Sequence, residues 1–239
     1  MTTNIAINRG SEWRKWDLHV HTPMSVLYNN YAMSDEEKDT LGNTLGIYNN
    51  DDLKMYNFIK KLFNKAIEQN IVAIGITDYF FLDGYKFIKK VLKDKEKLKL
   101  IFQEEIKRDT KFLEKVEEIL VLPNVEFRTS VVQNKSKLQI HAIFSDELDG
   151  DVIEQNFINC LKFQVAGEQQ NLTKNNVTDY GKMCKNSDIG GKGSDLLVGM
   201  NSISINLNDL RDLSQRKQFK DKVILVLADE DISKMSWES

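Results

Sequence analysis

Residues 16–21 read WDLHVH, and this short stretch sets the interpretation of the rest of the chain. Side chains alternate between the two faces of a strand, so Asp17, His19 and His21 fall on one face of a predicted strand, opposite two apolar residues. Imidazoles two residues apart project from the same side, close enough to share a metal ion or to bind adjacent ions. Without a metal or a carboxylate, such a buried pair leaves donors and acceptors unpaired. The pattern therefore predicts a metal site.

The segment that follows predicts a βαβ unit. Residues 22–50 are rich in Asn, Asp, Ser, Thr and Tyr and are predicted to form a long loop insert. Apolar residues then recur at helical spacing, with Asp51 or Asp52 as the N-cap and Asn70 near the end of the helix. Residues 71–79, IVAIGITDY, are apolar on both faces, as in a buried parallel strand.

The remaining chain continues to alternate between helices and strands. Helices are predicted at residues 84–100, 104–120, 152–163 and 203–213, and Pro123 breaks the helical pattern after the second of them. Strands are predicted at residues 125–132, 137–145 and 222–229, and the last of these is expected to be buried. Residues 167–195 are predicted to form a loop. This order predicts one α/β domain over residues 1–239, with polar residues at the C-terminal ends of its strands. A barrel and an open sheet both fit the pattern.

Composition excludes several classes of protein. The chain has 239 residues, 41% of them hydrophobic, with 33 Lys and Arg against 36 Asp and Glu. These values exclude disordered and collagen-like proteins and give no global attraction to polyanions. No apolar run suits a signal peptide or a membrane span, and the two cysteines lack metal-ribbon spacing. We therefore expect a cytoplasmic protein with no membrane partner.

Further candidate ligands lie within or just after other predicted strands. His141 lies in QIHAIF, and carboxylates stand at comparable places at Asp78, Glu126 and Asp229. Imidazole and carboxylate ligands together suit Zn, Mn or Fe. An ion of this kind makes bound water acidic enough to attack a phosphorus or carbonyl centre near neutral pH.

Several of these motifs resemble those of one family. WDLHVHTPMS (16–25) is similar to the first motif of the PHP, or polymerase and histidinol phosphatase, domains, which is D-x-H-x-H-T followed by Ser. ITDY (76–79), PNVEFR (123–128) and IHAIF (140–144) resemble the next three motifs in their order and spacing. The resemblance covers residues 13–145.

The resemblance implies a distorted (β/α)7 barrel, similar to a TIM barrel, that holds up to three metal ions at the C-terminal ends of its strands. The metal ligands that it implies are His19, His21, Glu126 and His141. Asp17 would orient a ligand imidazole by accepting its second N–H, and Asp78 would act as a ligand or a proton acceptor. Arg128 would bind a phosphate through two hydrogen bonds, with a surface ion pair as the alternative.

Two departures from the family pattern indicate an incomplete site. Tyr79 stands where the second motif of the family has a histidine, which removes one neutral ligand. No histidine follows His141, so the last D-x-H motif of the family is absent, and Asp229 is followed by two acidic residues. Either the last strand lies beyond Ser239 and the barrel is incomplete at its C-terminus, or the site is degenerate.

The first motif, the long insert and the lysine-rich middle look most like the PHP domains of large PHP–ATPase proteins, the TrlF-like family, some of which act in defence against phage. This likeness implies a metal-dependent phosphoesterase, acting as a nuclease on DNA or RNA or on a nucleotide, with an ATPase domain or subunit as partner. We also expect a homo-oligomer. A degenerate module with a structural or regulatory role in an ATPase assembly is the alternative. A metal-dependent amidohydrolase or deacetylase is a third candidate, because fold does not fix function.

Two further features bear on a nucleic-acid substrate. Residues 86–100 contain seven lysines against two acidic residues, which either neutralise a phosphate backbone or form the solvated face of a helix. Tyr79, Phe80, Phe81 and Tyr85 lie near the predicted site in sequence and either stack on a base or belong to the core.

Overall fold

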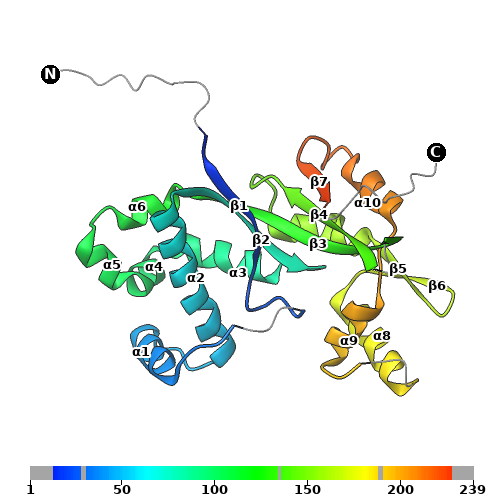
Figure 1. Cartoon of the computed structure of the whole chain (residues 1–239), viewed down its shortest axis with the longest axis horizontal. Coiled ribbons are helices and arrows are strands. Elements are labelled where there is room, and N and C mark those ends of the chain that lie inside the picture. Colours follow the sequence, from blue (N-terminus) through cyan, green and yellow to red (C-terminus); the bar gives the residue numbers. More distant parts are fainter. Residues whose placement is uncertain (1–12, 28–30, 134–135, 188–190, 228–239) are drawn as a thin grey trace.

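A five-stranded mixed sheet forms the centre of the computed structural model, which describes residues 13–27, 31–133, 136–187 and 191–227 (Figure 1). Its strands, in spatial order, are β1 (Lys15–His21), β2 (Ile71–Tyr79), β3 (Leu120–Gln133), β4 (Ser136–Phe144) and β7 (Val223–Leu227). β1, β2 and β3 run parallel, whereas β4 pairs antiparallel with both β3 and β7. The predicted α/β class is confirmed. Among the described strands, β1 and β7 are the two ends of the sheet and no closed barrel is found.

Helices gather at the two ends of this sheet (Figure 1). On the side of β1 and β2 lie α1 (Asp35–Leu45), α2 (Asn50–Gln69), α3 (Asp83–Lys93), α4 (Lys95–Ile101), α5 (Gln103–Arg108) and α6 (Phe112–Glu117). The rest of the chain forms α7 (Gly150–Asn156), the 3-10 helix η1 (Ile158–Cys160), the hairpin β5 (Lys162–Val165) and β6 (Glu168–Asn171), α8 (Lys174–Asn186), α9 (Asp195–Ser202) and α10 (Leu207–Ser214). No helix in the described ranges is long and apolar enough to cross a membrane.

The predicted βαβ unit is confirmed and contains the centre of the core. β1 and β2 are parallel, and α2 lies between them in the chain and contacts β2. Residues 73–78 of β2 are all buried, as expected of a strand with neighbours on both sides and helices packed against it. Phe63 of α2 and Phe127 of β3 are completely buried, so the core runs from the helices into the sheet.

The loop predicted at residues 22–50 contains a helix, α1, which is a correction to the sequence analysis. The hydroxyl of Ser34 accepts from the N–H of Glu37, and the carboxylate of Glu37 accepts from the N–H of Ser34. This capping box satisfies two N–H groups that the start of a helix otherwise leaves unpaired. Lys61 of α2 pairs with Glu37 at 2.7 Å and holds α1 against α2. The sequence contains the Ser-x-x-Glu signature of this cap, but the polar residues around it favoured the prediction of a loop.

The start of α2 also differs from the prediction, whereas its end agrees. Asn49 is the N-cap, and its side chain accepts from the backbone N–H groups of Asp51 and Asp52, the two residues predicted to be caps. Asn70 ends the helix in the left-handed conformation, with φ of 56°. Asparagine tolerates this conformation better than most residues do, which explains why the helix stops there.

The two long helices predicted at residues 84–100 and 104–120 are four short ones, α3 to α6. Asp94 leaves the helical conformation and accepts from the N–H of Lys97, which starts α4. Asp109 ends α5 in an extended conformation. Aspartate competes for backbone N–H groups in this way, so it divides a run of apolar residues that has helical spacing throughout.

The helical pattern ends before Pro123, as predicted, but Pro123 itself lies inside β3, which begins at Leu120. It precedes the first paired position of β3 with β4, which joins Asn124 and Ile143. A proline lacks the N–H that a central strand needs on one side, so this position just outside the β3–β4 ladder is one that it can occupy.

Several assignments in the C-terminal half are also wrong. The loop predicted at residues 167–195 contains β6 and α8, whose buried face is formed by Val177, Gly181 and Cys184 at helical spacing. Residues 152–163, predicted as one helix, divide between α7, η1 and β5. The helix predicted at 203–213 begins only at Leu207, after the separate helix α9. Abundant Asn and Lys obscured the short apolar patterns that define these elements.

β7 is not the buried strand predicted at residues 222–229. It lies at the edge of the sheet, antiparallel to β4, and its residues alternate in burial. Ile224 is 66% exposed and Val226 is 40% exposed. The continuous apolar run thus predicted a strand correctly, but it did not show which face of the strand is buried against the rest of the protein. Asp229 lies outside the described residues.

Candidate metal centre

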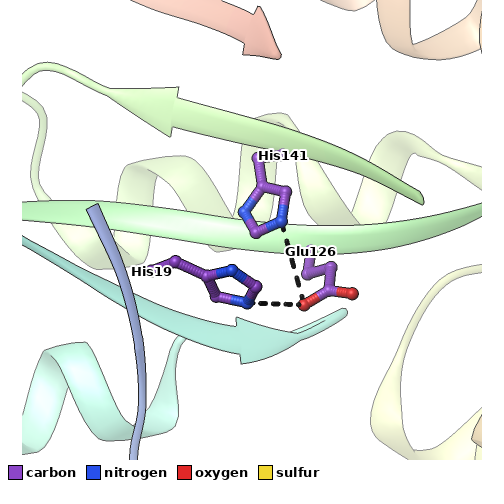
Figure 2. A group of neighbouring side chains, drawn as sticks. All are labelled: His19, Glu126 and His141. Carbon is purple, nitrogen blue, oxygen red and sulfur yellow. Dashed lines mark ion pairs between the residues drawn. The ribbon is translucent and has the colours of Figure 1, made fainter. Parts of the chain in front are cut away.

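All three histidines of the chain and one glutamate converge on one face of the sheet. Nε2 of His19 lies 3.0 Å from Nε2 of His21, and each of these atoms lies 3.4 Å from Oε2 of Glu126. Nε2 of His141 lies 3.9 Å from the same oxygen. Figure 2 shows His19, Glu126 and His141 pointing toward one another from three different strands. One ligand atom from each of these three residues lies within 4.8 Å of the others.

The pairing of β3 with β4 explains part of this convergence. Glu126 and His141 are direct partners in the antiparallel register, so their side chains lie next to each other on the same face. The family resemblance implies metal ions at the C-terminal ends of parallel strands. β4 runs the opposite way, and His141 lies within it rather than at its end.

A bulge in β1 sets the position of the histidine pair. The register of β1 with β2 shifts just after Asp17, and a Cβ atom added to Gly75 would lie 2.4 Å from the carbonyl oxygen of Leu18. Glycine is therefore required where the bulged backbone approaches β2. The prediction that His19 and His21 share a face agrees with their geometry. Asp17 accepts from the backbone N–H of His19 at 3.4 Å, whereas the predicted contact was with a ring N–H.

The distances in the cluster fit coordination of a metal ion. Two ligands of a zinc ion at typical bond lengths lie about 3.3 Å apart at the tetrahedral angle and about 3.0 Å apart at a right angle. The separations among the ligand atoms of His19, His21 and Glu126 are 3.0 and 3.4 Å. Nε2 of His141 lies farther from Glu126, at 3.9 Å, but His19, Glu126 and His141 still offer three ligand atoms within 4.8 Å of one another.

Three buried polar atoms of the cluster have no hydrogen-bond partner among the described residues: Oε1 and Oε2 of Glu126 and Nε2 of His141. Glu126 is only 1% exposed and His141 only 4%. A buried polar group without a partner costs on the order of 1–3 kcal/mol, and a charged one costs more. A divalent cation removes this cost because it accepts lone pairs from carboxylate and imidazole alike. The residues present therefore fit a metal.

The protonation states of the two buried ligands also suit a metal. Burial lowers the pKa of His141 to about 4. Burial alone would raise the pKa of Glu126, but its contact with His21 and the nearby rings of His141 and His19 bring this pKa below its usual value. Near neutral pH, His141 is thus neutral and Glu126 ionised, which are the forms that bind metal ions.

Asn124 is a site residue that the sequence analysis missed. Its Nδ2 donates to the carbonyl oxygen of Leu18 at 2.7 Å and to Oγ1 of Thr77 at 2.8 Å. Both amide atoms lie near Nδ1 of His141, Nδ2 at 2.9 Å and Oδ1 at 3.3 Å. A histidine that binds a metal through Nε2 carries its proton on Nδ1, and this N–H can donate a hydrogen bond to the amide oxygen of Asn124. Nothing in the local sequence marks the role, because it depends on three strands meeting at one amide.

Asp78 lies beside the cluster, but its carboxylate accepts hydrogen bonds from the segment after β1 and from α3. Its Oδ1 accepts from the N–H of Thr22 at 3.2 Å and from the hydroxyl at 2.9 Å, and its Oδ2 accepts from the N–H of Gly84 at 3.0 Å. Burial raises the pKa of Asp78 to about 6, although these hydrogen bonds act in the opposite direction. The contacts link the end of β1 to the start of α3. A role as ligand or proton acceptor stays a prediction.

Tyr79 occupies the position at which the resembled family has a histidine. Its ring stacks on that of His21, with centroids 4.9 Å apart and planes inclined by 18°. The guanidinium of Arg128 lies 5.4 Å from the centre of the same ring, and Nη1 donates to Oδ1 of Asn201 at 2.9 Å. Arg128 is therefore held beside Tyr79 by a neutral amide and by the Tyr79 ring, and it forms no ion pair with the residues that the structure describes.

The lysine-rich segment 86–100 falls on α3 and α4, and three of the neighbouring aromatics are buried. Lysines of α3 line a hollow together with the acidic segment 146–151, and Lys86 pairs with Glu154 at 2.7 Å. Lys86 is therefore neutralised locally, and a role of the other lysines in binding a phosphate backbone stays a prediction. Phe80, Phe81 and Tyr85 are at most 3% exposed and belong to the core.

Comparison with protein families, with curated proteins and with solved structures found no match for this chain. The geometry of the cluster and the motifs of the sequence are therefore the basis for the functional proposal.

Proposed function

We propose that this chain is a metal-dependent phosphoesterase. The observation that carries the proposal is the convergence of three imidazoles on the buried carboxylate of Glu126, whose oxygens have no hydrogen-bond partner in the described part of the chain. The resemblance of residues 16–25 to the first PHP motif supports phosphate esters as the substrate class.

The chain offers enough ligands for at least one metal ion. His19, His21, Glu126 and His141 would hold it, and four ligands of this kind suit Zn, Mn or Fe. When bound, such an ion supplies Lewis acidity toward water and toward the oxygens of a phosphoryl group.

The other residues of the site orient these ligands and the substrate. Asn124 fixes the ring of His141, and the ring of Tyr79 packs against that of His21. Arg128 places a positive charge next to Tyr79, from where it is proposed to bind a non-bridging phosphate oxygen. In the reaction, a water oxygen joins phosphorus, the bond from phosphorus to the leaving-group oxygen breaks, and that oxygen gains a proton.

The proposal extends to a PHP-type barrel and to association with an ATPase. The support for both is the likeness of the first motif, the insert and the lysine-rich middle to PHP–ATPase proteins. A barrel requires strands in addition to the five that form the described sheet.

The test compares variants of two glutamates that each have a buried oxygen without a partner among the described residues. Glu126→Gln keeps the size of the side chain but removes its charge, so we expect loss of bound metal and a fall of at least about 100-fold in hydrolysis of bis(p-nitrophenyl) phosphate with Mn²⁺ or Zn²⁺. Glu105→Gln is the matched control, because Glu105 also has a buried oxygen without a partner but contacts Asn64 and Lys60 of α2. Turnover that persists in EDTA and in Glu126→Gln refutes the proposal.

The alternative function is a PHP-like module without catalysis, and Tyr79 favours it. A phenol ring stacked on His21 takes the place of a family ligand. This alternative predicts a folded chain that retains less than a stoichiometric amount of metal after incubation with Mn²⁺ or Zn²⁺ and hydrolyses no ester. Plasma mass spectrometry of the desalted protein distinguishes the two functions.

A further inference from the structure

A hollow of about 590 Å³ opens directly on the histidine pair. Its lining includes Asp17, His19 and His21 of β1, and Tyr31 and Phe58 from other parts of the chain. Tyr31 belongs to the insert and Phe58 to α2. A volume of this size lies within the range of small-molecule sites, roughly 300–1,000 Å³. The insert after β1 therefore contributes part of the wall of the space next to the metal ligands.

The aromatic part of this wall presents ring surface. Tyr31 and Phe58 form an edge-to-face pair, with centroids 5.7 Å apart and planes inclined by 83°. The hydroxyl oxygen of Tyr31 is buried, so the part of Tyr31 that lines the hollow is its ring. Nζ of Lys61 lies 5.7 Å from the centre of this ring and helps to fix it. Exposed ring surface beside a phosphate-binding centre suits a substrate with a flat, apolar group.

The charges around the hollow disfavour a long polyanion. The residues that line it include one carboxylate, Asp17, and neither lysine nor arginine. A nucleic-acid strand carries one charge per phosphate and requires a groove of cations that follows its backbone. The lysines of α3 do not supply one, because they line a hollow with the acidic segment 146–151. A substrate with a single phosphate group, bound at the histidine cluster, needs no such groove.

We propose that the hollow binds the base of a nucleoside monophosphate, with the ring against Tyr31 and the phosphate at the histidine cluster. The inference rests on the proposed phosphoesterase function and names its substrate class. Hydrolysis joins a water oxygen to phosphorus, breaks the bond from phosphorus to the ribose oxygen, and leaves a proton on that oxygen. The products are a nucleoside and inorganic phosphate.

The experiment compares substrates with and without a base. KM and kcat are measured with Mn²⁺ for adenosine monophosphate, for glycerol 2-phosphate and for a 12-nucleotide single-stranded DNA. Stacking of a base on an aromatic ring corresponds to about a 5- to 100-fold change in affinity. We expect Tyr31→Ala to raise KM for adenosine monophosphate by this factor and to leave that for glycerol 2-phosphate unchanged. Tyr31→Phe keeps the ring and should behave like the wild type, as should Tyr48→Ala at an exposed tyrosine of the same insert.

Two results overturn the inference. One is an equal effect of Tyr31→Ala on both small esters, or no effect on either. The other is a kcat/KM for the oligonucleotide that exceeds that for adenosine monophosphate, which would make a polynucleotide the substrate. If the metal-loaded wild type hydrolyses no ester, the proposed function fails, and calorimetric titration with adenosine monophosphate still tests the hollow. Binding that weakens 5- to 100-fold in Tyr31→Ala supports the hollow, whereas no binding, or equal binding by both proteins, overturns it.

Discussion

Asn124 contacts three neighbouring strands through one uncharged side chain, next to the candidate metal ligands. It contacts the carbonyl of Leu18, the hydroxyl of Thr77 and Nδ1 of His141, so it joins β1, β2 and β4 from its own strand β3. Hydrogen bonds of this kind fix the tautomer and the orientation of a ligand imidazole. The arrangement of the cluster thus depends on a residue that does not bind the metal itself.

Removing this amide should weaken metal binding and stability together. We expect Asn124→Ala to lower the affinity for Zn²⁺ by about 10- to 100-fold and to destabilise the fold by about 1–3 kcal/mol. Asn64→Ala removes a partly buried hydrogen bond to Glu105 and should destabilise the chain without changing Zn²⁺ affinity. Competition with a chromophoric chelator measures the affinity. Equal Zn²⁺ affinity in Asn124→Ala and the wild type would contradict the positioning role.

Asp78 gives a dependence of stability on pH with a defined sign. Burial raises the pKa of Asp78 from 3.8 to about 6 in the folded chain. Between these two pH values, the folded state therefore keeps a proton that the unfolded state has lost. Its contribution to stability is full below about pH 4 and is lost as the pH rises through 6.

A variant without this titrating group should behave differently across that window. Relative to the wild type, Asp78→Asn should gain about 1 kcal/mol between pH 5 and pH 7, or about 2–4 °C in Tm, whatever its absolute stability. Thermal unfolding followed by circular dichroism at the two pH values measures this difference. A Tm difference between the two proteins that is constant over this range would show that Asp78 does not titrate in it.

At the scale of elements, residues 34–45 of the insert between β1 and α2 form a capped helix. The Ser34–Glu37 capping box starts α1, and the pair of Glu37 with Lys61 connects α1 to α2. These contacts give Glu37 a pKa of about 2, with the hydrogen bond from Lys61 as the largest cause. The helix following Tyr31 is therefore anchored to the core, which supports the wall of the hollow.

Loss of the cap should reduce stability by a modest amount. We expect Ser34→Ala to destabilise the chain by about 1 kcal/mol and to lower Tm by about 2–4 °C. Ser187→Ala is a suitable comparison, since the Ser187 hydroxyl donates to helix carbonyl groups at the end of α8 and does not cap a helix start. Urea unfolding of both variants gives the two free energies. A larger loss in Ser187→Ala than in Ser34→Ala would speak against the capping box as the element that holds α1.

At the scale of the whole molecule, the sequence predicted those features that depend on neighbouring residues. The alternation in WDLHVH and the apolar run of β2 are local patterns, and both strands and the helix between them were predicted. The direction of β4 and the edge position of β7 depend on which distant strands pair, so a local pattern could not supply them. Helices α1 and α8 carried readable caps at Ser34 and Thr173, and attention to caps would have located them.

Metal binding should stabilise the entire chain. A ligand present at 100 times its Kd adds about 2.7 kcal/mol, which for a chain of this size raises Tm by about 5–11 °C. Differential scanning fluorimetry with Mn²⁺ or Zn²⁺ should show this rise in the wild type, and EDTA should reverse it. The double variant His19→Ala/His21→Ala should show no rise. A rise of equal size in that variant would place the bound ion elsewhere.

The pairing of Glu126 with His141 also divides the cluster into two parts with different folding requirements. Glu126 and His141 lie in consecutive strands that are joined by a short connection. His19 and His21 are separated from Glu126 by more than 100 residues of sequence, as Leu18 is from its hydrogen-bond partner Asn124. Contacts close in sequence form before distant ones, because less chain entropy is lost. We therefore expect half of the cluster to assemble early with the β3–β4 hairpin and the other half only when β1 docks. Stopped-flow refolding with Zn²⁺ present from the start checks this order, since the metal should then slow unfolding and leave the refolding rate unchanged.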